Sequence, residues 1–184
     1  MAPVSTVTSA KFDTPFPRGA FFGANSPIIS LFMSNDLFRI DGKVAWITGG
    51  TKGLGLQFAN ALASQGAHIA INSRHGAEAA AAAKEVAEKH GVKAIGAEVD
   101  VTKFDQVEAF VARVTKELGS LDILVNNAGV NVRQPTVELP VEEWQRVVDI
   151  NLTGPFLCSK AVAPGMIARK WGRIINLSSI LGQV

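Results

Sequence analysis

The chain is poor in several residue types, and each shortage excludes a class of function. It holds one cysteine, Cys158, which excludes an internal disulfide and a metal site built from several thiolates. It contains no tyrosine, so no phenol group is available as a general acid or base. Charged residues make up 18%, Lys and Arg (18) nearly balance Asp and Glu (16), and no basic cluster predicts binding to nucleic acid or an anionic membrane. No apolar run approaches the roughly 20 residues that a membrane-spanning helix needs.

Length and composition favour one globular domain. The 184 residues are 47% hydrophobic, which is enough to build a buried core. Residues 1–32 hold four of the eight prolines and five of the ten phenylalanines, and no helical or strand period persists there. We interpret this segment as a disordered or targeting arm, or as an extension preceding a start at Met33, with the domain over residues 33–184. We expect a soluble, cytoplasmic protein, or one imported into an organelle if residues 1–32 are a transit peptide.

From Asp41 onward, short apolar runs alternate with helix-like segments. The runs predicted as strands are 43–48, 67–72, 93–99, 121–125 and 173–177. The helices predicted between them are 53–65, 76–90, 102–118 and a long one from residue 140 or 141 to about 168. Such βαβ repetition produces a parallel sheet with helices on both faces. The expected fold class is therefore α/β, with a doubly wound parallel sheet.

A glycine-rich turn follows the first predicted strand and leads directly into a helix. Its sequence, TGGTKGLG over residues 48–55, has the spacing G-x-x-x-G-x-G and lacks the G-K-[ST] ending of a Walker loop. Glycine lets the backbone turn tightly and approach a pyrophosphate, whose charge the helix N-terminus stabilises. Glycine clusters are common in loops, but this placement predicts dinucleotide binding. The residues expected at the dinucleotide are Gly49, Thr51, Lys52, Gly53, Leu54 and Gly55.

The end of the second predicted strand bears on the choice of dinucleotide. A free ribose 2′-hydroxyl usually meets an acid about 20 residues past the glycines, but residues 56–77 contain none. Instead, Ser73 and Arg74 follow the strand and suit a 2′-phosphate, with Lys52 facing it from the glycine turn. This pattern favours NADP(H), with NAD(H) as the alternative. Otherwise, Arg74 and Lys52 are ordinary solvated charges.

Four motifs in order give the chain a family resemblance. They are TGGTKGLG (48–55), NNAG (126–129), NLTG (151–154) and GRIINLSS (172–179). With them the chain resembles the short-chain dehydrogenase/reductase family from about Leu37 to its last residue. The resemblance implies a Rossmann domain of an oxidoreductase that moves a hydride between NAD(P)(H) and an alcohol or carbonyl.

The resemblance also implies roles for particular residues. Asp100 and Val101 would hold the adenine, and Asn127, Ala128 and Gly129 would line the cofactor groove. Ser179 would polarise the substrate oxygen, and Asn151 would anchor a proton-relay water. Taken singly, each residue has a plainer reading as a strand end, a turn or a helix cap. The three histidines are too dispersed to predict a metal site or a triad.

Asn151 also stands out without the family. Pro155 has no N–H, so it cannot donate a helical hydrogen bond to the carbonyl of Asn151. That carbonyl must find water or another donor, as an anchored relay water requires. The alternative is that Pro155 only kinks the helix around the sheet.

The chain departs from the family in one respect. The family's general acid/base is a tyrosine followed four residues later by a lysine, and the 184 residues contain no tyrosine. The sequence contains five of the family's strands but neither the helix that carries this pair nor the remaining strands, so we interpret the chain as an incomplete record of the enzyme. Residues 173–177 are then expected to form an exposed apolar edge. A chain of this kind is expected to be inactive. The alternatives are a non-catalytic NADP(H)-binding module that acts alone or pairs with a full-length relative, and a product that does not fold stably.

The substrate class rests on similarity alone. Residues 131–162 look most like sugar-acid dehydrogenases of the gluconate 5-dehydrogenase type and like 3-oxoacyl reductases. The expected partner is therefore a small alcohol or carbonyl substrate (a sugar acid, polyol or 3-oxoacyl thioester), with no nucleic acid or membrane. The parent protein is expected to be a homo-oligomer, as closed symmetric assembly is common among soluble enzymes.

Overall fold

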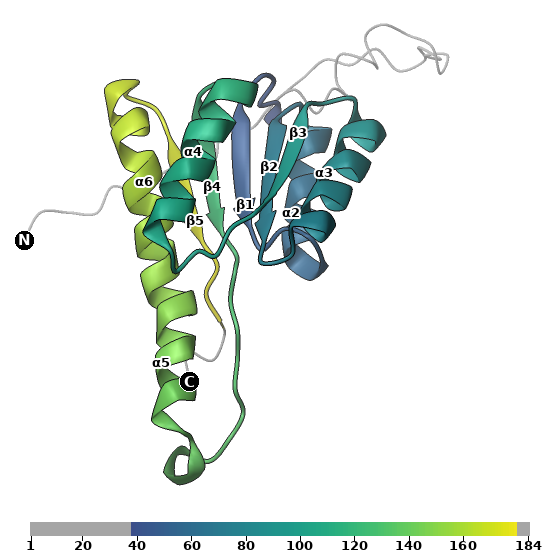
Figure 1. Ribbon diagram of the computed structural model, residues 1–184. Helices are drawn as coiled ribbons and strands as arrows, with labels where there is room; N and C mark the ends of the chain where they lie inside the picture. Colours follow the sequence, from purple (N-terminus) through teal and green to yellow (C-terminus); the bar gives the residue numbers. More distant parts are fainter. Residues whose placement is uncertain (1–37, 180–184) are drawn as a thin grey trace, which may run out of the picture. The chain divides into compact units, whose positions relative to one another are not determined.

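Five parallel strands form the centre of the molecule (Figure 1). The computed structural model describes residues 38–179, so the arm over residues 1–32 and the boundary at Met33 lie outside the described residues. The sheet order is β3-β2-β1-β4-β5, and every neighbouring pair is parallel. The strands are β1 (Val44–Thr48), β2 (His68–Ser73), β3 (Ala94–Glu98), β4 (Leu121–Asn126) and β5 (Arg173–Asn176). The predicted doubly wound parallel sheet is confirmed.

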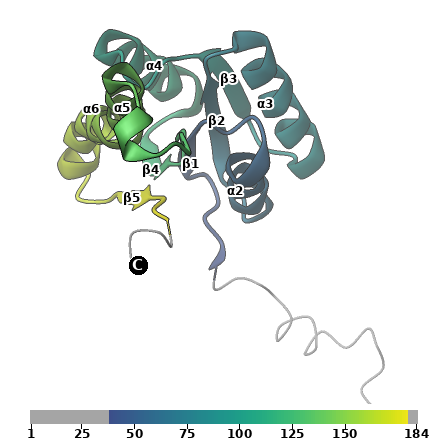
Figure 2. The same ribbon diagram turned by 90° about the horizontal axis from the view of Figure 1, so that it is seen from below.

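Helices cover both faces of the sheet (Figure 2). On one face α2 and α3 pack against β1, β2 and β3, and on the other α4 and α6 pack against each other and β4. The helices are α2 (Gly53–Ser64), α3 (Gly76–His90), α4 (Phe104–Leu118), α5 (Val141–Val148) and α6 (Gly154–Ala168). This layering follows from the βαβ alternation, because each right-handed crossover returns its helix to one face.

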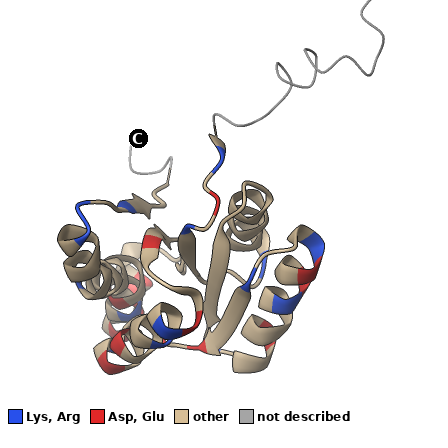
Figure 3. Cartoon of the chain, turned by 90° about the horizontal axis from the view of Figure 1, so that it is seen from above, with Lys and Arg blue, Asp and Glu red and all other residues tan. Residues whose placement is uncertain are grey.

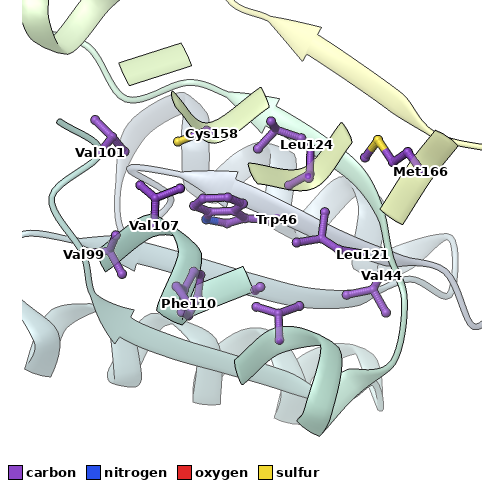
Figure 4. Packing of buried hydrophobic residues seen from close by; sticks show 13 residues of the cluster. Val44, Trp46, Val99, Val101, Val107, Phe110, Leu121, Leu124, Cys158 and Met166 are labelled. Carbon is purple, nitrogen blue, oxygen red and sulfur yellow. The ribbon is translucent and has the colours of Figure 1, made fainter. Parts of the chain in front are cut away.

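The first strand divides its side chains between two cores. Val44 and Trp46 belong to the core under α4 and α6, whereas Ala45 and Ile47 belong to the core over α2 and α3. Alternate side chains of a strand point to opposite faces, so a central strand is apolar throughout. Trp46 is fully buried and meets the ring of Phe110 edge-on, with 5.4 Å between ring centroids (Figure 4). Residues 44–47 therefore form a continuous apolar run because both faces of β1 are covered.

Predicted and observed elements agree to within about two residues. Helix α3 has the predicted bounds of 76–90, and Gly91 ends it in the left-handed conformation with φ 68°. Gly119, with φ 103°, ends α4. A residue with a side chain rarely adopts such φ values, which is why glycine occupies these helix ends.

The long helix predicted from residue 140 or 141 to about 168 is continuous but irregular at its middle. Between α5 and α6, residues Asp149–Thr153 form a π-helical turn, in which the N–H of Gly154 donates to the carbonyl of Asp149. Pro155 follows directly and supplies no donor. In the i−4 register its missing hydrogen bond falls on the carbonyl of Asn151, and in the i−5 register on that of Ile150. The irregularity expected from Pro155 is therefore present.

Strand β5 lies at one edge of the described sheet. Ile174, Ile175 and Leu177 are 39%, 46% and 37% exposed. Only β4 pairs with β5 among the described residues. The exposed apolar edge predicted over residues 173–177 is confirmed.

Charges of both signs are interspersed along the helices (Figure 3). Three of the ion pairs lie within single helices, namely Lys84–Glu88 in α3, Arg113–Glu117 in α4 and Glu143–Arg146 in α5. Exposed pairs of this kind contribute little to stability. No helix within residues 38–179 has the length and apolar character to span a membrane.

Candidate functional site

A cavity of about 320 Å³ opens at the carboxyl ends of the parallel strands. Ligands of open α/β sheets bind at this edge, where the winding direction reverses. It is lined by Gly49, Thr51, Lys52, Asn72, Ser73, Arg74, His75, Glu78, Val99, Asp100, Val101, Asn127, Ala128, Gly129, Val130 and Ile150. The loops after four neighbouring strands therefore meet in one place.

The glycine turn after β1 requires glycine for two different reasons. Gly49 has φ +63°, and a Cβ there would lie 3.1 Å from the Cα of Ala128. Gly55, in the first turn of α2, has ordinary φ, but its Cβ would lie 2.5 Å from both Asn127 Nδ2 and the carbonyl oxygen of Gly49. The turn therefore closes tightly against the loop after β4 and leaves the N-terminus of α2 uncovered. Such a cradle suits a pyrophosphate.

A set of hydrogen bonds joins the turn to the loop after β4. Thr48 Oγ1 accepts from the N–H groups of Asn127 (3.0 Å) and Ala128 (2.9 Å). In return, Asn127 Nδ2 donates to the carbonyls of Thr48 (2.9 Å) and Gly49 (3.1 Å). Thr48 is buried, so these bonds are shielded from water. Asn127 thus fixes the turn from the side, which is the groove-lining position that the resemblance implied.

Two cations reach the cavity, Lys52 from the glycine turn after β1 and Arg74 from the end of β2. The side chains of Lys52 and Arg74 are exposed and line it, and neither has a hydrogen bond or ion pair among the described residues. Ser73 Oγ accepts from the N–H of His75 (2.9 Å) and donates weakly to its carbonyl (3.2 Å). Asn72, which precedes them, is buried and holds the strand ends by accepting from Trp46 Nε1 and donating to the carbonyl of Val99. The two cations remain available to an anion.

The loop after β3 is held in place by its own residues. Asp100 Oδ1 accepts from both the N–H and the hydroxyl of Thr102, and the N–H of Asp100 donates to Gln106 Oε1. Val101 is buried against Gly154, whose Cβ would lie 2.9 Å from Val101 Cγ2. The helix junction at Gly154 and the loop thus approach closely at the cavity. A second cavity adjoins this end and shares Arg74, Asp100 and Ile150 with the first.

Asn151 lies in the π-helical turn and clamps the loop after β4. Its Oδ1 accepts from the N–H of Val130, and its Nδ2 donates to the carbonyl of Val130, each at 2.8 Å. The side chain is therefore committed to positioning the loop, so an anchored water could use only the main-chain carbonyl of Asn151. Ser179 follows β5 and is exposed. Next to it, Asn126 Nδ2 ties β4 to β5 through Asn176 Oδ1 at 2.8 Å.

Most of the site residues predicted from the sequence meet in the cavity. Ten of them line it, whereas Gly53, Leu54, Gly55, Asn151 and Ser179 do not. Six lining residues were missed: Asn72, His75, Glu78, Val99, Val130 and Ile150. Five of these directly adjoin predicted residues in sequence, so counting outward from the motifs would have found them. Glu78 adjoins none and enters only because α3 begins at the cavity.

The remaining reactive side chains lie outside the cavity. His68 is in β2, and His90, at the end of α3, contacts Asn60. Cys158 is buried in α6, and burial raises the pKa of its thiol to about 12. Within the described part of the chain, no three His, Cys, Asp or Glu residues gather where they could hold a metal ion.

The fold and the cavity together define a class of protein. The domain has a doubly wound parallel sheet, a glycine turn with no room for a Cβ at Gly49 or Gly55, and two cations, Lys52 in that turn and Arg74 after β2, that have no partner among the described residues. These features make up a Rossmann-type dinucleotide-binding domain. Residues 43–184 match the family model described as short chain dehydrogenase. The chain belongs to the short-chain dehydrogenase family, as the four motifs indicated.

Curated relatives of two kinds are similar to the chain. It is 41% identical over 152 residues (83% of this chain) to a 2-dehydro-3-deoxy-D-gluconate 5-dehydrogenase of Formosa agariphila. It is 40% identical over 150 residues (82%) to a 5-keto-D-gluconate 5-reductase of Escherichia coli. It is also 37% identical over 144 residues (78%) to a 3-oxoacyl-[acyl-carrier-protein] reductase of Aquifex aeolicus. The chain spans 58–59% of the length of these relatives.

Solved structures share the fold at similar identity. A gluconate 5-dehydrogenase of Burkholderia cenocepacia in complex with NADP and tartrate has a TM-score of 0.76 and 40% identity, over 81% of this chain and 58% of that one. An L-sorbose reductase of Gluconobacter frateurii with NADPH and L-sorbose has a TM-score of 0.74 and 38% identity, over 78% of this chain and 54% of that one. An NAD⁺-bound xylitol dehydrogenase has a TM-score of 0.74 and 37% identity, over 78% of this chain and 55% of that one. Relatives of this fold therefore bind either nicotinamide dinucleotide.

Proposed function

We propose that this chain is the dinucleotide-binding part of an oxidoreductase that uses NADP(H) and an alcohol or carbonyl substrate. The observation that carries the proposal is a pair of cations, Lys52 in the glycine turn and Arg74 after β2, that line the cavity without a partner in the described part of the chain. When bound, the nicotinamide supplies or accepts a hydride. The protein's own residues would bind, orient and desolvate the reacting groups.

Each part of the cleft has a task in this proposal. The turn from Gly49 to Gly55 would hold the pyrophosphate at the N-terminus of α2. Arg74 and Lys52 would hold a 2′-phosphate, which would compete with the carbonyl of His75 for the proton of Ser73. Asp100 and Val101 would hold the adenine. Asn127, Ala128 and Gly129 would line the groove, with Asn151 fixing the adjoining loop through Val130.

For the substrate, we propose a sugar acid, polyol or 3-oxoacyl compound. This proposal is supported by the names of the relatives, which act on 5-keto-D-gluconate, 2-dehydro-3-deoxy-D-gluconate or a 3-oxoacyl group. Ser179 would polarise the substrate oxygen by hydrogen bonding, and the carbonyl of Asn151 would anchor a relay water. We also propose that the parent protein is a homo-oligomer.

The decisive experiment titrates the chain with NADPH and NADH and compares Arg74→Asp with the unaltered protein. We expect NADPH to bind the unaltered chain, and its Kd to rise about 10- to 100-fold in the variant, because a charge-assisted hydrogen bond is replaced by repulsion. The NADH Kd should change little. Arg133→Asp, an exposed charge reversal outside the cavity, is the matched control. An equal NADPH affinity in the Arg74 variant would overturn the NADP(H) assignment.

A second candidate is a non-catalytic NADP(H)-binding module. It is favoured by the absence of tyrosine from all 184 residues, since the family's acid/base residue has no counterpart among them. Such a module would bind the dinucleotide through the same cleft, alone or paired with a full-length relative. Both candidates predict that NADP(H) binds in this cleft, but only the first predicts that the protein oxidises or reduces a substrate.

A further inference from the structure

An acid enters the cofactor cleft from an unexpected place. The sequence between residues 56 and 77 is free of Asp and Glu, but the first turn of α3 brings Glu78 to the cavity wall, alongside Ser73, Arg74 and His75. Glu78 is exposed and has no hydrogen bond or ion pair among the described residues. Its carboxylate therefore adds a negative charge to the lining of the cavity that also holds the two cations.

Positive and negative side chains lining the cavity are equal in number, although the sequence motifs indicate an excess of positive charge. Lys52 and Arg74 line the cavity as cations, and Glu78 and Asp100 line it as anions. Two hydrogen bonds from Thr102 engage one oxygen of Asp100. Outside the lining, Glu98 reaches α3, because a Cβ on Gly76 would lie 3.3 Å from Glu98 Oε2. Of the two acids in the cavity, Glu78 is the one that has no partner within residues 38–179.

We infer that Glu78 sets the cofactor preference of the cleft by opposing Arg74 and Lys52, so that the chain accepts both NADP(H) and NAD(H). The inference rests on the proposed function, since it concerns the same cleft. A 2′-phosphate carries close to two negative charges and is repelled by a nearby carboxylate. A free 2′-hydroxyl is not repelled and can donate a hydrogen bond to that carboxylate. Glu78 thus lowers the affinity for NADP(H) relative to NAD(H).

Sequence spacing explains why this acid is easily overlooked. The usual acid of NAD-specific domains lies at the end of the second strand, whereas Glu78 lies four residues beyond Arg74, inside the next helix. An acid in the first turn of a helix is also favourable for the helix dipole. A stabilising role in α3 alone would leave nucleotide selectivity unaffected, which makes the two roles separable by experiment.

The test compares Glu78→Gln with Glu85→Gln in the full 184-residue chain. Both residues are exposed, both lie on α3, neither is paired among the described residues, and each substitution removes one negative charge. Only Glu78 lines the cavity, and seven residues of helix separate the two by roughly 10 Å. Kd values for NADPH and NADH would be measured by quenching of tryptophan fluorescence, a readout that does not require turnover.

We expect Glu78→Gln to lower the NADPH Kd about three- to fivefold at low ionic strength and to leave the NADH Kd unchanged or raised. High salt should reduce the effect, because exposed charges are screened. Glu85→Gln should leave the ratio of the two Kd values at its original value. The inference is overturned if Glu78→Gln leaves that ratio unchanged while both nucleotides still bind, or if Glu85→Gln shifts it equally. If the unaltered chain binds neither nucleotide, the proposed function fails and the inference with it.

Discussion

At the scale of single residues, two amide side chains, the buried Asn72 and the half-buried Asn127, build the cleft as much as the glycines do. Asn72 links Trp46 in β1 to the carbonyl of Val99, and Asn127 links the loop after β4 to the carbonyls of Thr48 and Gly49. Each amide makes two hydrogen bonds between neighbouring strand ends, where an unpaired polar group would be costly. Both therefore hold the loops that line the cavity at fixed separations.

Cys158 offers a prediction at the same scale. Burial raises the pKa of its thiol from 9.0 to about 12, so the folded protein retains the proton over a range where the unfolded chain loses it. Stability is therefore unaffected below about pH 9 and falls as the pH rises above it, by about 1.4 kcal/mol at pH 10. Urea unfolding at pH 8 and pH 10 measures the fall, and no tyrosine titrates in this range. In Cys158→Ala this part of the pH dependence should vanish, and its persistence would contradict the prediction.

At the scale of elements, the contact between α2 and the loop after β4 decides whether the cleft forms. Gly55 brings the first turn of α2 within van der Waals reach of Asn127, and Gly154 brings the long helix equally close to Val101. These approaches hold the glycine turn and the loop after β3 where both line one cavity. The π-helical turn Asp149–Thr153 adjoins the second of them, consistent with the frequent occurrence of such turns at functional sites.

Gly55→Ala should separate steric from conformational effects of glycine. The new methyl group would lie 2.5 Å from Asn127 Nδ2, so we expect a loss of stability of about 2–3 kcal/mol and much weaker NADPH binding. Gly91→Ala is the control, because Gly91 has φ +68° with open space around it. It should cost about 1 kcal/mol and leave binding intact. Thermal unfolding and an NADPH titration measure both effects, and equal losses of binding in the two variants would argue against a specific contact.

At the scale of the whole molecule, the described sheet is covered on both faces over β1 and β2 but is open at β5. Trp144, Leu152 and Phe156, on the surface of the long helix, are 59%, 69% and 61% exposed. Ile174 and Ile175 in β5 are exposed as well. The cofactor cleft lies at the carboxyl ends of the strands, where the loops that follow them meet. All of its lining residues fall within 49–150. Under the proposed function, dinucleotide binding and turnover therefore depend on different parts of the fold.

This separation leads to a prediction about turnover. The 184-residue chain should bind NADPH yet show no oxidation of NADPH with 5-keto-D-gluconate or a 3-oxoacyl thioester, because none of its residues is a tyrosine. Absorbance at the nicotinamide band measures the rate, and a relative that is active on the same substrate serves as the positive control. Measurable reduction by the purified chain would refute the assignment of the missing acid/base.

Much of the architecture was predictable from local pattern. Apolar runs bounded by glycine indicated all five strands, and Gly91 and Gly119 indicated the ends of two helices. The glycine turn and Arg74 were predicted at the dinucleotide from local pattern, and residues 127–129 from the family resemblance. The structure brings them to one cavity, because parallel strands end at a common edge. The involvement of Pro155 in a helix irregularity was also predictable, since a missing N–H is a covalent property.

Sequence by itself determined the succession of strands and helices along the chain, the glycine-rich turn and the family, because these depend on residues close together in the chain. Only the tertiary structure decided which side chains share the cavity. It brought in Glu78 from a helix that the motifs do not touch, and it committed the Asn151 side chain to Val130. The physical reason is that charge balance and hydrogen-bond commitment depend on distances between loops that are separated by tens of residues. Those distances are set by how closely α2, α3 and the long helix pack on the sheet.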